Sequence, residues 1–168
     1  MAEFHDKKIK FVVDVNLGKL AHYLLLLGFD TKHSNSLIND AELAEVSSGE
    51  NRILLTRDRE LLKRKKVTQG YFVHNTILQD QVVEVLKQFH LLNDVRLCTR
   101  CTDCNVPIHP IDKARIQGAV PPLVFLSYKE FYLCPDCGKI YWKGTHYENL
   151  MNTLEQFKDR FYLASDTK

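Results

Sequence analysis

The sequence predicts an α/β protein in which a parallel β-sheet flanked by helices is followed by a smaller second module. Between residues 9 and about 92, short apolar runs of strand length alternate with segments whose apolar residues recur at helical spacing. Strands that alternate with helices in this way form a parallel sheet covered on both faces. The rest of the chain breaks this pattern and contains two Cys-x-x-Cys pairs, which predict a separate, metal-stabilised module.

The first two predicted strands enclose one helix. Residues 9–13, Ile-Lys-Phe-Val-Val, are a β-branched apolar run of strand length. Leucine and alanine residues then recur at helical spacing over 17–27, and Gly28 follows as a residue type that ends helices. Residues 29–33 predict a second, short strand.

A second helix, a buried strand and a basic helix are expected next. Asn39 and Glu42 have the spacing of a capping box, which predicts a helix that runs through Val46. The apolar run 52–56 predicts a buried strand, and 60–65 predicts a short basic helix. The last elements of this region are a strand over 70–74 and an amphipathic helix over 78–89.

The two cysteine pairs predict a zinc ribbon. Each pair places two thiolates on one tight turn, and two such turns supply the four soft ligands of a tetrahedral Zn²⁺ ion. Asn105 and Gly138 directly follow the two pairs, and these residue types most easily adopt the positive φ of a metal-binding turn. Cys98 lies three residues before the first pair, so spacing alone leaves the ligand choice at that end open. The predicted zinc ligands are Cys101, Cys104, Cys134 and Cys137.

We expect three parts along the chain, whose 168 residues can form one ordinary core and a small satellite module. The α/β domain is assigned to residues 1–93, the zinc ribbon to 94–150, and a C-terminal helix and tail to 151–168. Between the cysteine pairs, the proline-rich segment 107–132 predicts a loop insertion rather than a helix. A helix over 153–162 is left to pack on either module, and it and the ribbon are the candidate surfaces for a protein partner.

Composition narrows the class of protein. The net charge of +2 argues neither for nor against nucleic acid. No apolar run approaches the ~20 residues that span a membrane, so we expect no membrane contact. The start of the sequence has no apolar segment after a basic one, which disfavours a secretory signal. Cysteines in metal-type pairs indicate a reducing compartment, and we therefore expect a cytoplasmic protein.

Acidic and polar residues follow three predicted elements at one edge of the sheet. Asp14 comes directly after the first strand, with Asn16 two residues on, and Thr56 and Asp58 follow the 52–56 strand. Asp40 opens the second helix, at the same edge if the connections are right-handed. In a parallel sheet, ligands gather beyond the carboxyl ends of the strands. Converging carboxylates favour a hard divalent ion that activates water against a phosphodiester, with Thr56 and Asn16 positioning water or substrate.

Each member of this set also has a purely structural interpretation. Asp14 and Asn16 are common turn residues, and Asp40 is suited to cap its helix. Asp58 has neighbouring arginines with which to pair on the surface, and Thr56 ends a strand. The hypothesis of a metal site therefore depends on the whole set.

Cationic residues gather in two places that suit a phosphate backbone. Residues 52–66 contain seven cationic residues against two acidic ones, and a solvated helix face is the alternative interpretation. Near the chain's end, Tyr141 and Trp142 stand beside lysines and are candidates to stack on unpaired bases. For Trp142 we favour the alternative, that it packs the ribbon onto the first domain. The candidate RNA-binding residues are Arg57, Arg59, Lys63, Arg64, Lys65, Lys66, Lys143 and His146.

Three blocks of sequence, in this order, resemble one nuclease family. Residues 11–20, Phe-Val-Val-Asp-Val-Asn-Leu-Gly-Lys-Leu, with Leu-Gly-Phe-Asp at 27–30, look like the opening of a PIN-like nuclease domain. Residues 52–61, Arg-Ile-Leu-Leu-Thr-Arg-Asp-Arg-Glu-Leu, are similar to that family's second acidic signature. Residues 134–146, Cys-Pro-Asp-Cys-Gly-Lys-Ile-Tyr-Trp-Lys-Gly-Thr-His, resemble the zinc tail of one branch, the Mut-seven C-terminal RNase domain. The resemblance covers roughly residues 9–150.

This resemblance implies a PIN-like, metal-dependent ribonuclease fold that acts on RNA. It implies that Asp14, Asp40 and Asp58 hold Mg²⁺ or Mn²⁺, and it matches the family's first cysteine pair to residues 101 and 104. The zinc would then be structural.

The chain departs from the family pattern at one acid. PIN nucleases commonly carry a further acid, often Glu, in an inserted helical segment, and the nearest candidates here are Glu42 and Glu45. Two rival hypotheses therefore stay open. One is an RNA-binding or assembly module whose vestigial acidic site does not cleave. The other is a protein-interaction module that uses the ribbon and the C-terminal helix.

Overall fold

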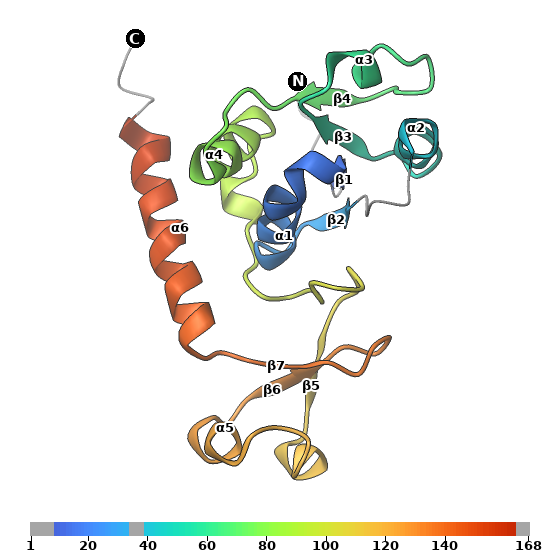
Figure 1. The fold of residues 1–168 in the computed structure, drawn as a ribbon. Helices are drawn as coiled ribbons and strands as arrows, with labels where there is room; N and C mark the ends of the chain where they lie inside the picture. The colour runs from blue at the N-terminus through green and yellow to red at the C-terminus, as the bar shows by residue number, and fades with distance from the viewer. Residues whose placement is uncertain (1–8, 34–38, 164–168) are drawn as a thin grey trace, which may run out of the picture.

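The computed structural model describes residues 9–33 and 39–163 of the chain. Its larger part is a four-stranded sheet with all neighbouring strands parallel, in the order β2-β1-β3-β4 (Figure 1). The strands are β1 (Lys10–Val13), β2 (Asp30–His33), β3 (Ile53–Thr56) and β4 (Gly70–Phe72). The helices of this part are α1 (Gly18–Leu26), α2 (Asp40–Gly49), α3 (Arg59–Leu62) and α4 (Leu78–Gln88), with 3-10 turns η1 (Val15–Leu17) and η2 (Leu92–Asp94). The predicted α/β class with a parallel sheet is confirmed.

Local sequence accounts for most of these element boundaries. The predicted capping box is present, because Asn39 Oδ1 accepts from the N–H groups of Ala41 and Glu42 while the Glu42 side chain accepts from the Asn39 N–H. The basic helix expected over 60–65 is shorter than predicted. It ends at Leu62, and residues 63–66 form the turn that leads toward β4.

Alternate residues of the central strands enter two separate cores. Phe11, Val13 and Leu55 pack with apolar residues of α1 and α4. Val12 and Leu54 point the other way and pack with apolar residues of α2 and α3. Figure 1 accordingly shows α1 and α4 on one side of the sheet and α2 and α3 on the other. Burial on both faces is what the continuous apolar runs predict.

The strand order creates a switch point between β1 and β3. From β1 the chain crosses by α1 to β2, and from β3 it crosses by α3 on the opposite face to β4. The connections that leave these two neighbouring strands therefore diverge at their carboxyl ends. Such a divergence leaves a crevice in which open parallel sheets bind ligands.

The second part is a small antiparallel sheet with its own core. Its strands are β5 (His109–Ile111), β6 (Phe131–Leu133) and β7 (Ile140–Trp142), in the order β5-β6-β7. Between β5 and β6 lie the 3-10 turn η3 (Lys113–Ile116) and helix α5 (Pro122–Ser127). The expectation of a plain loop insertion over 107–132 is therefore wrong. Pro121 and Pro122 start α5 rather than prevent it, because the first helical turn needs no N–H from proline.

Trp142 packs inside this second part and not onto the first domain, which corrects the sequence-based interpretation. It belongs to a cluster with Ile116, Val120 and Phe131, and its ring centroid lies 6.5 Å from that of Phe131. Buried Gly144 makes this possible, because a Cβ there would lie 2.9 Å from Trp142 Nε1. The second part thus has a core of its own against which its tryptophan packs.

The C-terminal helix α6 (Thr145–Leu163) begins earlier than the predicted residue 153. It lies beside α4, and Leu154 and Phe157 join the core on the α1 and α4 side of the parallel sheet. Of the two packing partners left open by the sequence, the helix therefore uses the first domain. Within the described residues, no helix has the length and apolar character needed to cross a membrane.

A glycine fixes the junction between the two parts. Gly28 has φ +93°, and a Cβ at this position would lie 2.2 Å from the Arg96 carbonyl oxygen. The segment that follows η2 lies directly against it, since the Arg96 N–H donates to Leu27 O at 2.9 Å and the Cys98 N–H donates to Leu26 O at 2.8 Å. The chain that leads to the second part is thus fastened to the end of α1.

Candidate functional site

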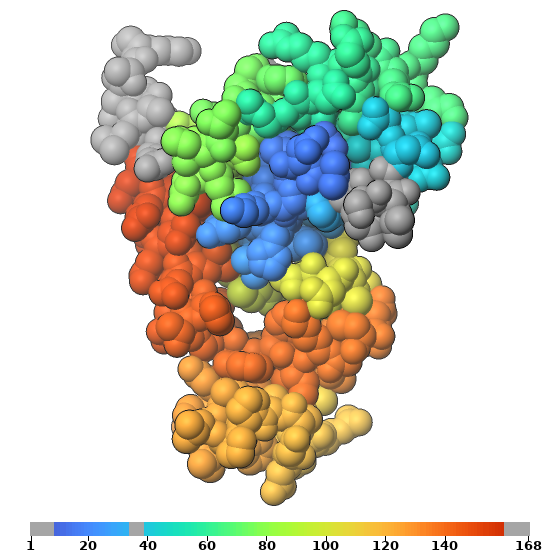
Figure 2. Space-filling view, in the orientation of Figure 1, coloured from blue at the N-terminus to red at the C-terminus, as the bar shows by residue number. Residues whose placement is uncertain are grey.

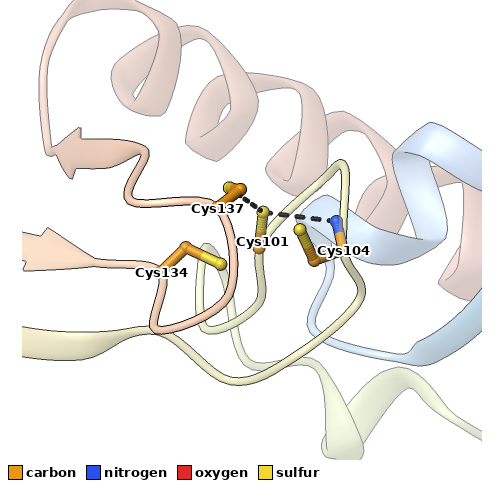
Figure 3. A group of neighbouring side chains, drawn as sticks. All are labelled: Cys101, Cys104, Cys134 and Cys137. Atoms are coloured by element: carbon orange, nitrogen blue, oxygen red, sulfur yellow. Dashed lines mark hydrogen bonds between the residues drawn. The ribbon is translucent and has the colours of Figure 1, made fainter.

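Four cysteines from the two predicted turns come together in the second part (Figure 3). Their Sγ atoms all lie within 4.8 Å of one another, and Cys101 Sγ is 3.7 Å from Cys137 Sγ. A tetrahedral zinc ion with Zn–S bonds of about 2.3 Å separates its sulfur ligands by about 3.8 Å. The cluster therefore has the size required to bind a metal ion. Its members are Cys101, Cys104, Cys134 and Cys137.

Each cysteine pair lies on the same kind of backbone turn. The Asn105 N–H donates to Cys101 O at 3.0 Å, and the Gly138 N–H donates to Cys134 O at 3.0 Å. Asn105 has φ +62° and Gly138 has φ +73°, as their residue types predict. The Cys104 N–H also points at Cys101 Sγ, at 3.4 Å. The local sequence thus shapes both turns.

Hydrogen bonds favour the thiolate form of Cys101. Burial opposes its ionisation, but the Tyr141 hydroxyl, which donates to Cys101 Sγ at 3.1 Å, and the N–H groups of Cys104 and Asp103 outweigh burial and lower the pKa of the thiol to about 6. Cys98 lies outside the cluster, and burial raises the pKa of its thiol. The geometry therefore selects the 101/104 pair, a choice that spacing left open.

The first cysteine turn is tied to the edge strand β2. Asn105 Oδ1 accepts from the Thr31 N–H at 3.0 Å, and its Nδ2 donates to Asp30 Oδ1 at 2.7 Å. Asp30 in turn accepts from the buried Arg52, which also donates to Phe11 O. Burial opposes ionisation of Asp30, but Arg52 and Asn105 outweigh it and lower the pKa of the carboxyl. The cysteine cluster is thereby anchored near the amino end of β2, away from the carboxyl edge.

Asp14, Thr56 and Asp58 meet at the switch point between β1 and β3. The Thr56 hydroxyl donates to Asp14 Oδ2 at 2.8 Å and accepts from the Asp58 N–H at 2.9 Å. Asp14 is only 6% exposed and Thr56 is fully buried. Asp58 Oδ1 caps α3 by accepting from the N–H groups of Glu60 and Leu61. The polar residues at the ends of β1 and β3, which the sequence predicted to lie at one edge of the sheet, are therefore in contact.

The remaining residues of the predicted acidic set are placed differently. Asp40 opens α2, as expected, but its exposed carboxylate pairs with Arg64, with Asp40 Oδ2 3.4 Å from Arg64 Nη2. Asn16 is exposed within η1. Among the described residues, one group of three or more potential metal ligands has its ligand atoms close together, and that group is the cysteine cluster. The three aspartates do not form such a group.

Several of the predicted RNA-binding cations are engaged within the protein. Arg57 Nη1 donates to the carbonyls of Val73, His74 and Asn75 at 2.6–3.1 Å. The Arg59 guanidinium lies 4.7 Å from the Phe72 ring centroid. Lys63 pairs with Glu60, Lys66 with Glu45 and Lys143 with Glu130, whereas Lys65 and His146 are exposed. Exposed ion pairs of this kind are weak, so their lysines stay accessible to phosphate.

Sequence reasoning missed a carboxylate that organises the loop after β4. Glu84 of α4 accepts from the N–H groups of His74 and Asn75, from the Asn75 amide and from the Tyr71 hydroxyl at 2.7–3.0 Å. Burial opposes ionisation of Glu84, but the hydrogen bonds from His74 and Asn75 outweigh it and lower its pKa to about 2. The same loop carries the three carbonyls bound by Arg57. A lone Glu on a helix gives no sequence signal for this role.

Comparison with known proteins gives one family. No curated protein and no solved structure matches the chain. The family described as the Mut7-C RNAse domain matches residues 9–154, which include both the parallel sheet and the cysteine cluster. The match spans the three blocks on which the sequence resemblance was based and most of the chain. The chain therefore belongs to the Mut7-C RNAse domain family.

Proposed function

We propose that the protein is a metal-dependent ribonuclease that hydrolyses RNA phosphodiester bonds at the carboxyl edge of the parallel sheet. Membership of an RNase domain family points to RNA as the substrate. The observation that supports this position is the meeting of Asp14, Thr56 and Asp58 at the switch point. It is the place at which the fold class binds ligands.

The chain's own residues have distinct roles in this proposal. Asp14 is oriented by the Thr56 hydroxyl, which leaves its other oxygen for a metal ion. Asp58 caps the helix through Oδ1 alone. Its Oδ2 has no hydrogen-bond partner among the described residues and is available to a metal ion. Asp40 would join them by exchanging its contact with Arg64 for the ion, and exposed Asn16 would position water or substrate. Mg²⁺ or Mn²⁺ held by these residues would supply an activated water and charge stabilisation at the phosphate.

We assign a structural Zn²⁺ ion to the four cysteines, in a zinc ribbon formed by the two turns and the β5-β6-β7 sheet. An S₄ set closes the coordination sphere and leaves no position for substrate. In this proposal residues 1–93 are the PIN-like domain, 94–150 the ribbon and 151–168 the C-terminal part, so the last boundary falls within α6. Free thiolate ligands require a reducing compartment such as the cytoplasm.

Cations near the acidic edge would guide the RNA backbone. Arg59, Lys63, Arg64, Lys65 and Lys66 lie on or just after α3, which Asp58 caps. Arg57 contributes by holding the loop after β4, since its Nη1 donates to three carbonyls of that loop. Lys143 and His146 belong to the second part, where they would contact the RNA at a distance from the cleavage site.

The decisive test is the cleavage of end-labelled RNA in Mn²⁺, in Mg²⁺ and without added divalent metal. Asp58→Asn removes the charge but keeps the α3 cap, because Asn caps helices as well as Asp does. We expect this variant to lose at least 100-fold in cleavage rate, on the order of 3 kcal/mol of transition-state stabilisation. Asp112→Asn is the matched control, because Asp112 also caps a turn through its side chain but lies in the second part. Equal cleavage by both variants would contradict the proposal.

One observation favours a second candidate function, RNA binding without cleavage. The carboxylate of Asp40 is paired with Arg64, and the three aspartates do not gather into one cluster. A protein of this kind would shift RNA on a native gel, leave it intact on a denaturing gel in every metal, and show the same affinity for the wild type and Asp58→Asn.

A further inference from the structure

One face of the β5-β6-β7 sheet carries tyrosines. Tyr132 of β6 is paired in register with Tyr141 of β7, so their rings are neighbours on the same face. The residues that alternate with them, Phe131 and Trp142, occupy the opposite face and pack with η3 and α5. The apolar neighbours of the tyrosine face are the cysteine turns and Ile108, and no helix belongs to that cluster within the described residues. This face therefore packs on the cysteine turns, and Tyr132 and Tyr141 remain partly exposed beside them.

Two lysines lie among these rings. Lys143 Nζ is 5.9 Å from the centroid of Tyr132 and 5.8 Å from that of Tyr147, in the first turn of α6. Lys139 Nζ is 5.7 Å from the centroid of Tyr141. Lys143 thus lies near two rings, Tyr132 and Tyr147, and Lys139 lies near the third, Tyr141.

The cluster is accessible to a ligand. The side chains of Lys139 and Lys143 are each 48% exposed, and all three tyrosines are partly exposed. The lysines pair with Asp103 at 2.9 Å and with Glu130 at 3.5 Å, and both partners are exposed. Such pairs are weak and readily exchanged for a phosphate. Figure 2 also shows an opening between the start of α6, the β7 region and the segment after α4, so the β7–α6 connection is not covered there.

The chemistry of the cluster identifies its ligand. Aromatic rings stack on the bases of unpaired nucleotides, which double-stranded RNA does not expose. Ammonium groups beside the rings suit the phosphates that link those bases. An acidic peptide would use the lysines alone and leave the three rings without a role.

We infer that Tyr132, Tyr141 and Tyr147, with Lys139 and Lys143, form a platform that binds unpaired nucleotides of the RNA outside the cleavage site. The inference rests on the proposed function in that it takes RNA as the ligand, but it does not require that the protein cleaves. Trp142, the most obvious stacking residue in the sequence, has no part in the platform because it is packed on the other face.

The contribution of Lys143 to RNA binding is tested by fluorescence anisotropy with a labelled 12-nucleotide single-stranded RNA. The Asp58→Asn background keeps the RNA intact, and the absence of chelator keeps the zinc bound. Lys143→Glu is expected to weaken binding about tenfold and to lower the magnitude of the salt dependence by about 0.7, the value for one phosphate on a single strand. Lys158→Glu is the matched control, because Lys158 is 41% exposed and also pairs with a glutamate. It should bind within twofold of the background protein.

The contribution of base stacking is tested by comparing the RNA affinity of Tyr147→Ala, which removes the ring, with that of Tyr147→Phe, which keeps it. The alanine variant should bind the single strand about tenfold more weakly, as expected for the loss of one stacked base, and the phenylalanine variant should bind nearly as tightly as the background. Neither change should affect binding of a duplex of the same length. The zinc content of every variant, expected to be one ion per chain, checks that the module stays folded.

The experiments distinguish a failure of the proposed platform from a failure of the proposed cleavage site. If Lys143→Glu and Tyr147→Ala bind the single strand within twofold of their controls, the platform is overturned even if Asp58→Asn abolishes cleavage. If no single-stranded RNA binds, the platform is overturned as well. Cleavage that survives Asp58→Asn, together with binding that depends on Tyr147, would instead remove the proposed active site and leave the platform in place.

Discussion

The cysteine cluster and the acidic edge of the parallel sheet differ in how complete they are. The Sγ atoms of the four cysteines already lie within 4.8 Å of one another, and a backbone hydrogen bond closes each of the two cysteine turns. At the acidic edge, Asp14 and Asp58 are joined through Thr56, whereas Asp40 is held by Arg64. Cysteine ligands can approach one another before metal binds because Cys104 and Cys134 stay neutral thiols, since hydrogen bonds to the other cysteines and burial raise their pKa values. Carboxylates, by contrast, repel one another at neutral pH. A site for a hard ion therefore stays open until the ion arrives.

Removal of a cysteine ligand should have the largest effect on the molecule. Cys134→Ser is expected to abolish binding of one zinc ion and to unfold the second part, because structural zinc binding is worth about 10–16 kcal/mol in small domains. Zinc content and thermal unfolding followed by circular dichroism measure this. Cys98→Ser removes a thiol outside the cluster and should retain the ion. Loss of zinc from both variants would show that the ligand set is wrong.

The junction between the two regions should be the next most sensitive point. Gly28→Ala places a Cβ 2.2 Å from the Arg96 carbonyl at a φ of +93°, and we expect it to lower the free energy of unfolding by about 3 kcal/mol or more. Gly118→Ala has a similar φ of +81° but meets no atom within 4 Å, so backbone strain alone should cost about 1 kcal/mol. Denaturant unfolding of both variants separates the two causes. Equal losses would mean that the junction contact is not important.

The loop after β4 tests whether the Glu84 carboxylate stabilises the structure beside the acidic edge. Glu84→Gln leaves its N–H donors with a weaker acceptor and should cost about 2 kcal/mol of stability. Because the pKa of Glu84 is lowered from 4.5 to about 2, its contribution is fully present above pH 4.5 and is lost as the pH falls toward 2. The stability difference between wild type and variant should therefore shrink over that range. A difference that is the same at pH 7 and pH 2.5 would rule out the carboxylate as the cause.

The contact between Asp40 and Arg64 should have the smallest effect and addresses the difference between the two regions directly. Arg64→Ala frees the Asp40 carboxylate, and if Asp40 is a metal ligand the concentration of Mn²⁺ required for half-maximal cleavage should fall about threefold. The exposed pair itself contributes about 0.2–1 kcal/mol to stability. Lys63→Ala, which also removes an exposed ion pair from this region, serves as the control. An unchanged Mn²⁺ requirement would exclude Asp40 from the site.

The sequence anticipated those parts of the two sites that depend on short stretches of chain. Asp14 and Thr56 are predictable as neighbours because each ends a strand that belongs to the same parallel sheet. Asp40 was expected at the same edge, and its helix does begin there, but its side chain takes the contact offered by Arg64, 24 residues further on. The roles of Arg57 and Glu84 were not predictable, since each depends on loop carbonyls or N–H groups brought close only by folding.

Taken by itself, the sequence determined the alternation of strands and helices, the capping box at Asn39 and the two cysteine turns, because periodicity and turn geometry act over a few residues. The tertiary structure alone decided that Trp142 packs in one core of the second part while Tyr132 and Tyr141 face the cysteine turns, and that Asn105 joins the cysteine turn to Asp30. These outcomes depend on contacts between residues far apart in the chain. The free energy of such contacts is set by which surfaces the whole fold buries, and no local pattern encodes it.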